Sequence, residues 1–247
     1  AQSMIKLCHD HGAKVACVTK VTCAHPAMAL AFERGGADMI ADSRIMNLMS
    51  LSNTGIPLPL MLLRIPAPSK AADVVRCADV TLNSSLQTMH LLSDAAHFLH
   101  KRHQVIVMVD IGDLREGVWP DHAMGLVKQA SKLPGIEVIG LGCNLSAYGG
   151  VIPSVENMHE LIEIRDNCRR ATGLELATPL AFLGAAAPSY LLARTRWFEW
   201  GAVLLVITAT AGPCLAGGLE TSPPAIVVAL TLSLVGVGIG SLLLPFE

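Results

Sequence analysis

Short apolar runs alternate along most of the chain with stretches in which apolar residues recur every three or four positions. Runs of roughly four to eight residues that are rich in branched side chains predict strands, whereas the wider spacing predicts amphipathic helices. The clearest helix is expected at 86–101, where one face carries Leu86, Met89, Leu92, Ala96 and Leu99. The apolar runs predict strands at 15–19, 38–42, 59–64, 79–83, 105–110, 137–142 and 179–183.

This alternation is typical of an α/β fold, either a TIM-type (β/α)8 barrel or a doubly wound sheet. The predicted strands are one short of the eight that a barrel needs. The apolar stretch 202–210 supplies the eighth, or the eighth is absent. In either fold, right-handed crossovers place the carboxyl ends of parallel strands on one face, so residues at those ends converge.

Polar residues follow the predicted strands directly. They are Lys20, Asp42, Ser43, Arg44, Arg64, Asn83, Ser84, Asp110, Asp113, Arg115, Glu116 and Asn144. A lysine after a strand is more often a solvated loop residue, and Asp42, Ser43, Asn83 and Ser84 are also good caps for the helices that follow. An amine at the end of a buried strand can nevertheless form a Schiff base, which makes Lys20 the candidate for chemistry.

The segments that carry these residues have a recognisable order: VTKVTCAHP, ADSRIMNL, LPLMLLRIP, DVTLNS, VIVMVDIGDLREGVWP and LGCNLSAYGGVIP. Together they resemble the alanine/ornithine racemase family from about residue 2 to about residue 176. The resemblance implies the barrel of the alanine racemase N-terminal domain, pyridoxal phosphate (PLP) as cofactor, and racemisation of a small amino acid of the alanine or ornithine type. It leaves open whether the protein is a homodimer.

The resemblance also assigns roles to individual residues. Lys20 is implied to carry the cofactor as a Schiff base and to exchange the substrate's α-proton, with Tyr148 as the opposing acid/base group. Arg115 is implied to meet the cofactor's phenolic oxygen or a substrate carboxylate. The remaining cofactor-binding candidates are Ser43, Asn83, Asn144, Gly184 and Ser189, of which the last two would be remnants of a phosphate-binding turn.

Both ends of the chain depart from the family pattern. The sequence begins without a methionine in an expected helix at 2–11, so a preceding strand is predicted to be missing. Gly12 is predicted to end that helix in a left-handed conformation. Beyond Thr172 the resemblance weakens, and the arginine- and glutamate-containing motif of the family's eighth strand has no counterpart. We therefore expect an incomplete barrel with atypical seventh and eighth strands.

Charge and side-chain chemistry exclude several classes of function. The 18 basic residues all precede Trp197 and form no stripe, which argues against a nucleic-acid partner. No metal site is predicted, because the histidines lack clustered acids or cysteines; His90, His97, His100 and His103 are expected on or beside helices.

The seven cysteines include no C-x-x-C pair and favour reduced thiols in the cytoplasm. Six are expected to be packing residues: Cys8, Cys17, Cys23, Cys77, Cys143 and Cys168.

The last part of the chain is unusually apolar. Residues 200–219 and 221–246 are almost free of charge, and each run is about as long as the roughly 20 residues that cross a bilayer. We therefore divide the chain into a PLP-binding barrel at 1–196 and a hydrophobic tail at 197–247. Three interpretations of the tail stay open: a two-span membrane hairpin that anchors a cytoplasmic domain, a hydrophobic closure of the barrel, and a sequence join that is not biological.

Two other functions compete with racemisation. One is a PLP-binding protein without turnover that carries or regulates the cofactor; the missing strand-eight motif favours it. The other is a membrane protein whose racemase domain is a relic. The complete DLREG segment, which contains Arg115, together with Asn144, favours the enzyme.

Overall fold

The computed structural model describes residues 2–10, 12–145, 151, 154–177 and 180–183. Its chain divides into two compact units, of which the first comprises Ala1–Asn144 and Ser154–Ala181. The architecture below is that of the first unit. The predicted boundary at 196/197 and the predicted membrane spans lie outside the described residues. No helix in the described ranges is long and apolar enough to cross a membrane.

The strands form one sheet in which each strand is the neighbour of the next along the chain. All pairs from β1 to β6 are parallel. The strands predicted from the apolar runs are confirmed, with ends that differ by at most three residues. They are β1 (Ala16–Val18), β2 (Met39–Asp42), β3 (Leu60–Leu62), β4 (Val80–Asn83), β5 (His103–Met108), β6 (Ile136–Leu145) and β7 (Leu180–Leu183).

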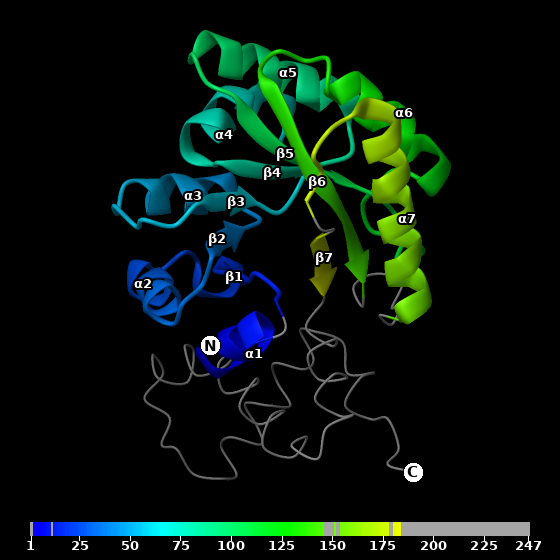
Figure 1. The fold of residues 1–247 in the computed structure, drawn as a ribbon. Coiled ribbons are helices and arrows are strands. Elements are labelled where there is room, and N and C mark those ends of the chain that lie inside the picture. The colour runs from blue at the N-terminus through cyan, green and yellow to red at the C-terminus, as the bar shows by residue number, and fades with distance from the viewer. Residues whose placement is uncertain (1, 11, 146–150, 152–153, 178–179, 184–247) are drawn as a thin grey trace, which may run out of the picture. The chain divides into compact units, whose positions relative to one another are not determined.

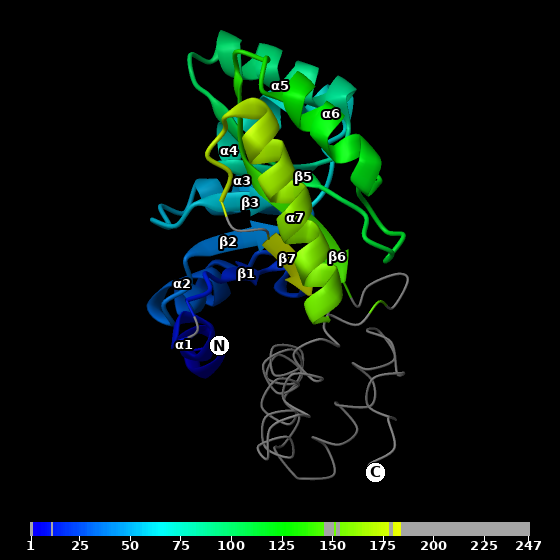
Figure 2. The same cartoon turned by 45° about the vertical axis from the view of Figure 1, so that its right-hand side comes forward.

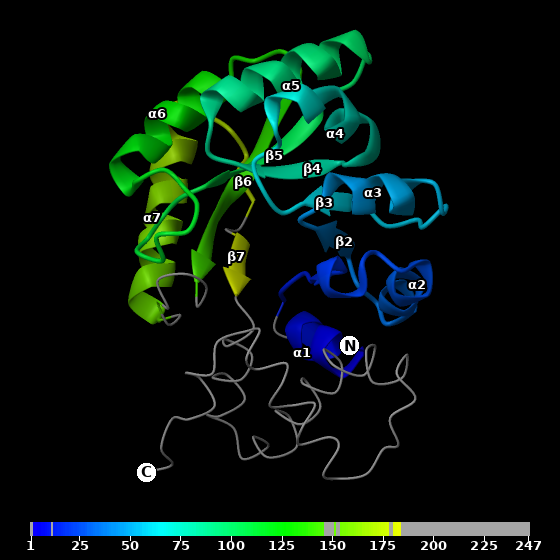
Figure 3. The ribbon, with the colours of Figure 1, turned by 180° about the vertical axis from the view of Figure 1, so that it is seen from behind.

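The sequential strand order decides between the two predicted folds. In a doubly wound sheet the order reverses at a switch point, and helices then cover both faces. Here the order never reverses, and the helices from α2 to α7 lie on the outer side of the curved sheet in Figure 1 and, after rotation, in Figure 2 and Figure 3. The helices are α1 (Gln2–Asp10), α2 (Pro26–Arg34), α3 (Ile45–Ser52), α4 (Ala71–Cys77), α5 (Leu86–Phe98), α6 (Pro120–Ala130) and α7 (Val155–Thr172). This α/β winding is that of a TIM-type barrel.

Burial along the strands agrees with this winding. Every residue of β3 and β4 is buried, although successive side chains point to opposite faces. Since the helices cover only the outer face, the inner face is buried within the curve of the sheet. The outer face packs against the apolar stripe of α5, where Met89, Leu92 and Ala96 are fully buried as predicted.

The first helix ends where the sequence predicts. Gly12 has a φ of +75°, and its N–H donates to the carbonyl of His9 while the N–H of Ala13 donates to that of Cys8. This pair of bonds is the Schellman motif that satisfies the last carbonyls of a helix.

Helix α5 ends three residues earlier than the predicted 101. His100 has a φ of +52°, and the N–H groups of His100 and Lys101 donate to the carbonyls of His97 and Ala96. The same motif therefore closes α5 without a glycine. Histidine is one of the side chains that tolerate this conformation, so the apolar pattern alone could not reveal the end of the helix.

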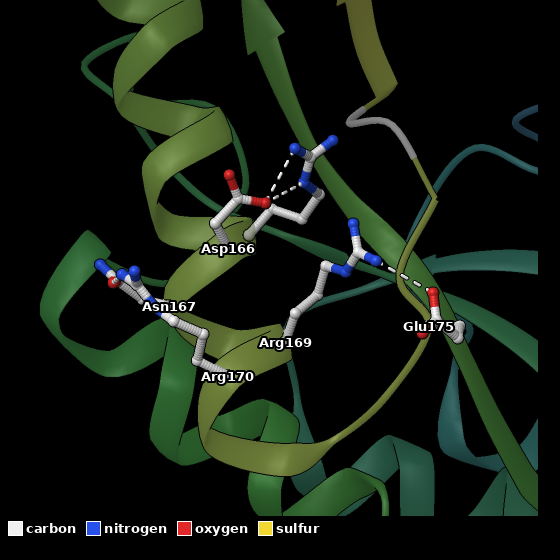
Figure 4. Close-up of polar contacts among 6 residues, drawn as sticks. Asp166, Asn167, Arg169, Arg170 and Glu175 are labelled. Carbon is white, nitrogen blue, oxygen red and sulfur yellow. Dashed lines mark hydrogen bonds and ion pairs between the residues drawn. The ribbon is translucent and has the colours of Figure 1, made fainter.

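The last turns of α7 carry ion pairs, which Figure 4 shows. Arg165 pairs with Asp166 at 2.8 Å and Arg169 with Glu175 at 3.0 Å, while Arg170 donates a hydrogen bond to Asn167. The Arg169–Glu175 pair links α7 to the segment that follows Gly173, whose φ of +71° ends the helix. Glu175 is 90% exposed, so this pair orients the segment but adds at most about 1 kcal/mol.

Two of the side-chain predictions need correction. Cys143 and Cys168 are buried as expected, but Cys23 is exposed because it adopts a left-handed turn after β1. His90, His97 and His100 lie on the surface, whereas His103 begins β5 and is buried. The ring Nε2 of His103 lies 3.0 Å from Thr81 Oγ1, and burial lowers its pKa from 6.5 to about 4.

We predict that His103 makes the fold sensitive to acid. Between pH 6.5 and about 4 the unfolded chain binds a proton at His103 that the folded chain does not, so stability falls as pH decreases through this window. The full loss attributable to His103 is about 3 kcal/mol. Urea unfolding of the wild type and His103→Gln from pH 7 to pH 4 should show a flatter pH dependence in the variant. His90→Gln, on the surface, is the control, and parallel curves for wild type and His103→Gln would contradict the prediction.

Candidate active site

Lys20 occupies a tight turn at the carboxyl end of β1. The strand ends at Val18, Thr19 pairs its N–H with the carbonyl of Ala41, and a short 3-10 helix follows at Lys20–Thr22. The carbonyl of Thr19 accepts hydrogen bonds from the N–H and the hydroxyl of Thr22. The turn therefore holds the backbone of Lys20 in place and leaves its side chain half-buried.

A buried carboxylate connects this turn to the neighbouring strand. Asp42, the last residue of β2, accepts hydrogen bonds from Thr19 Oγ1 at 2.8 Å, the Arg44 N–H at 2.8 Å and Asn47 Nδ2 at 3.0 Å. It is fully buried. Asp42 does not cap α3, whose N-cap is Arg44 without a side-chain cap bond; it holds the turn before the helix and ties the residue before Lys20 to β2.

The loop after β5 positions two further charged side chains. The backbone doubles back so that Val118 N–H donates to Met108 and Asp110 N–H donates to Val118, at 2.9 and 2.8 Å. Inside the loop, Asp110 Oδ1 accepts from the N–H groups of Gly112 and Leu114. These bonds fix the backbone just before Arg115 and Glu116.

Gly117 is required for the loop to close. Its φ is +148°, and a Cβ at this position would lie 2.4 Å from the backbone nitrogen of Asp110. Any other residue would push the two arms of the loop apart.

These elements surround a cleft of about 430 Å³. Its described lining residues are Lys20, Ser43, Leu63, Arg64, Ile65, Arg115 and Glu116, which come from the carboxyl ends of β1, β2, β3 and β5. Burial lowers the pKa of Lys20, the charge of Arg115 lowers it further, and Asp42 acts in the opposite direction. The site therefore favours the neutral, nucleophilic form of this amine.

Burial shifts the pKa of Glu116 as well, but upward, because its charged form is an anion. Burial raises its pKa, whereas Arg115, a hydrogen bond from the Ile65 backbone and Arg64 lower it. Its Oε1 atom is buried and has no hydrogen-bond partner among the described residues. Its backbone carbonyl accepts from Asn144 Nδ2 at 3.3 Å.

The two predicted asparagines lie toward the carboxyl ends of β4 and β6, which β5 separates in the sheet. Asn83 ends β4 and is fully buried; its Oδ1 accepts from the Ser85 N–H at 2.8 Å, while its Nδ2 has no partner within the described part of the chain. The residue that caps α5 is Ser85, not Asn83 or Ser84. Asn144 lies in β6 and supports the loop of Glu116.

The structure thus brings Lys20, Ser43 and Arg115 to one cleft, as the convergence of strand ends predicts. Tyr148, Gly184 and Ser189 lie outside the described residues. Arg64 and Glu116 were predicted to follow strands, but the resemblance gave neither of them a role in the site; the structure places both in the cleft. Within the described ranges no group of histidine, cysteine or acidic side chains could hold a metal ion.

Comparisons with known proteins agree with this fold. The family model for the N-terminal domain of alanine racemase matches residues 1–204. An ornithine racemase from Acetoanaerobium sticklandii is 41% identical over 187 residues, which are 75% of this chain and 52% of the relative. A lysine racemase from Thermotoga maritima is 30% identical over 176 residues, 71% of this chain and 49% of the relative. The chain therefore spans about half the length of the curated relatives it matches.

Solved structures give the same fold at low sequence identity. An alanine racemase from Clostridium difficile 630 has a TM-score of 0.59 at 20% identity, over 69% of this chain and 48% of that one. PipY from Synechococcus elongatus PCC7942, solved with PLP bound, has a TM-score of 0.54 at 17% identity, over 68% of this chain and 89% of that one.

We predict that Asp42→Ala destabilises the protein by about 2 to 3 kcal/mol, because it leaves buried donors without their acceptor. Urea unfolding followed by circular dichroism measures the loss. Asp94→Ala, on the exposed face of α5, should change stability by less than about 0.5 kcal/mol. Equal effects of the two substitutions would show that the Asp42 hydrogen bonds do not hold the site together.

We predict that Arg115→Gln raises the pKa of Lys20, because it removes a positive charge that disfavours the lysine cation. Titration of the lysine side-chain carbons by NMR in the cofactor-free protein measures this pKa directly. Arg76→Gln, an exposed change on α4, should leave it where it was. An unchanged or lower pKa in Arg115→Gln would mean that Arg115 does not act on Lys20.

Proposed function

Because the chain belongs to the family of the alanine racemase N-terminal domain, we propose that it is a PLP-dependent amino-acid racemase in which Lys20 carries the cofactor. The observation that supports this most is the placement of Lys20, with its lowered pKa, in the cleft that Arg115 also lines. A neutral amine is the form that reacts with an aldehyde.

The residues of the cleft fit such a cofactor. Three cationic side chains, Lys20, Arg64 and Arg115, line it and suit an anionic ligand. At the end of β4, Asn83 offers a buried Nδ2 donor that has no partner among the described residues. We propose Ser43, Asn83 and Asn144 as groups that orient the cofactor, and Gly184 and Ser189 as part of its phosphate site.

Bound PLP supplies the electron sink that makes the α-proton of an amino acid acidic. In the proposed reaction, Lys20 Nζ moves the α-proton on one face of the substrate, and Tyr148 does so on the other. The planar guanidinium of Arg115 holds the substrate carboxylate and so orients the α-carbon. Burial and Arg115 lower the pKa of Lys20, which shifts the amine toward the neutral form that can accept a proton.

The substrate is proposed to be a small or basic amino acid. The two curated relatives are named for ornithine and lysine, which favours a basic amino acid over alanine. A PLP-binding protein without turnover is the second candidate, favoured by the lack of a match to the strand-eight motif in the sequence. The third interpretation, a relic racemase domain on a membrane protein, depends on residues outside the described part of the chain.

We predict that PLP becomes attached to Lys20. Reduction of the PLP-loaded protein with borohydride followed by trypsin should give a labelled peptide that covers residues 15–34, because a modified Lys20 is no longer cleaved. Lys20→Ala should lose the label, whereas Lys70→Ala, which removes a lysine paired with Asp73, should keep it. A label on another lysine would contradict the assignment.

Turnover is tested separately by exchange of the α-proton into deuterated water with ornithine, lysine and alanine. Exchange that Lys20→Ala reduces by more than about a hundredfold supports a racemase. A labelled protein without any exchange would favour the PLP-binding protein.

A further inference from the structure

The cleft around Lys20 contains an acid that the proposed proton transfers do not use. Lys20, Arg64 and Arg115 give the cleft its positive charge, and among the described residues that line it Glu116 is the acidic one. An acid that only balanced this charge would be expected to have both carboxyl oxygens paired. Glu116 has one oxygen without a partner among the described residues, and burial raises its pKa.

One oxygen of Glu116 is satisfied and the other is not. The carboxyl accepts a hydrogen bond from the Ile65 backbone, but its Oε1 atom is buried without a partner among the described residues. The pKa of Glu116 is raised because burial outweighs the combined influence of Arg115, the Ile65 bond and Arg64. The neighbouring cations therefore do not replace the hydration that the carboxylate has lost.

The position of Glu116 is fixed by its surroundings. Its backbone is held by Asn144 through the hydrogen bond to its carbonyl, and by the closed loop that depends on Gly117. Only the last torsion of the side chain is soft. Rotation about this torsion would turn the second oxygen toward a ligand in the cleft.

The chemistry of an amino-acid substrate shows what could pair with this oxygen. In the proposed function, the α-amino group of the substrate is engaged at the cofactor that Lys20 carries, and its carboxylate is engaged at Arg115. The group left to meet Glu116 is the side chain. An alkyl side chain would leave the buried oxygen unpaired, whereas an ammonium group would donate to it and balance its charge.

We propose that Glu116 binds the distal ammonium group of a basic amino-acid substrate and is the residue that selects ornithine or lysine over an alkyl amino acid. This inference rests on the proposed racemase function. An ammonium in a cleft lined by three cations is otherwise repelled, and Glu116 supplies the opposing charge. Sites built to pair with a polar substrate group reject analogues that lack it.

The test compares two amino acids that differ in one group. Norvaline has the propyl chain of ornithine without its amine. In Glu116→Gln, which keeps an acceptor for Ile65 but cannot be ionised, the ratio of kcat/KM for ornithine to kcat/KM for norvaline should fall about tenfold to a hundredfold. Borohydride labelling of Lys20 in the same variant shows whether the cofactor still binds.

Glu137→Gln is the matched control, because Glu137 lies near the start of β6 and pairs with Gln104 at the opposite end of the strands. Its ornithine-to-norvaline ratio should equal that of the wild type. An unchanged ratio in Glu116→Gln, or equal losses for both substrates, would overturn the assignment while leaving the racemase intact.

A binding measurement separates this inference from the proposed function. Calorimetric titration with ornithine and norvaline, with and without PLP, needs no turnover. If the wild type racemises neither amino acid, the proposed function fails. A preference for ornithine that Glu116→Gln abolishes would then still support Glu116 as the ammonium site, and the absence of such a preference would overturn it.

Discussion

The hydrogen bond from Thr19 to Asp42 is the constraint on which the site depends. At 2.8 Å it joins the residue after β1 to the last residue of β2 in a fully buried position. Lys20 follows Thr19 directly, and Ser43 follows Asp42, so one bond sets where both enter the cleft. Asp42 also accepts from Arg44 and Asn47. The reactive amine is therefore positioned by groups that belong to the sheet and to α3.

Burial disfavours the charged forms of both Lys20 and Glu116 in the cleft. It lowers the pKa of Lys20 and raises that of Glu116, so both groups are displaced toward their neutral forms. Arg115 reinforces the change at Lys20 and opposes it at Glu116. Arg115 therefore favours the neutral amine of Lys20 and the ionised carboxyl of Glu116, which are the forms that the proposed reaction and the proposed ammonium site use.

Much of the fold could be predicted because buried parallel strands appear in the sequence as continuous apolar runs. That Lys20, Ser43 and Arg115 line one cleft could also be predicted, because the carboxyl ends of parallel strands lie on one face of the sheet. The end of α5 at His100 and the burial of His103 could not be predicted, because each depends on a local conformation or a packing partner. The sequence likewise could not predict that Glu116 Oε1 is buried without a hydrogen-bond partner among the described residues, because this depends on its three-dimensional surroundings.

The close approach at Gly117 limits how this protein could evolve. Because a side chain there would collide with the backbone of Asp110, the loop that presents Arg115 and Glu116 does not tolerate a substitution of Gly117. With the role proposed for Glu116, a lineage that acquired a new substrate would replace Glu116 itself or change the segment at Arg64 and Ile65 that lines the same cleft.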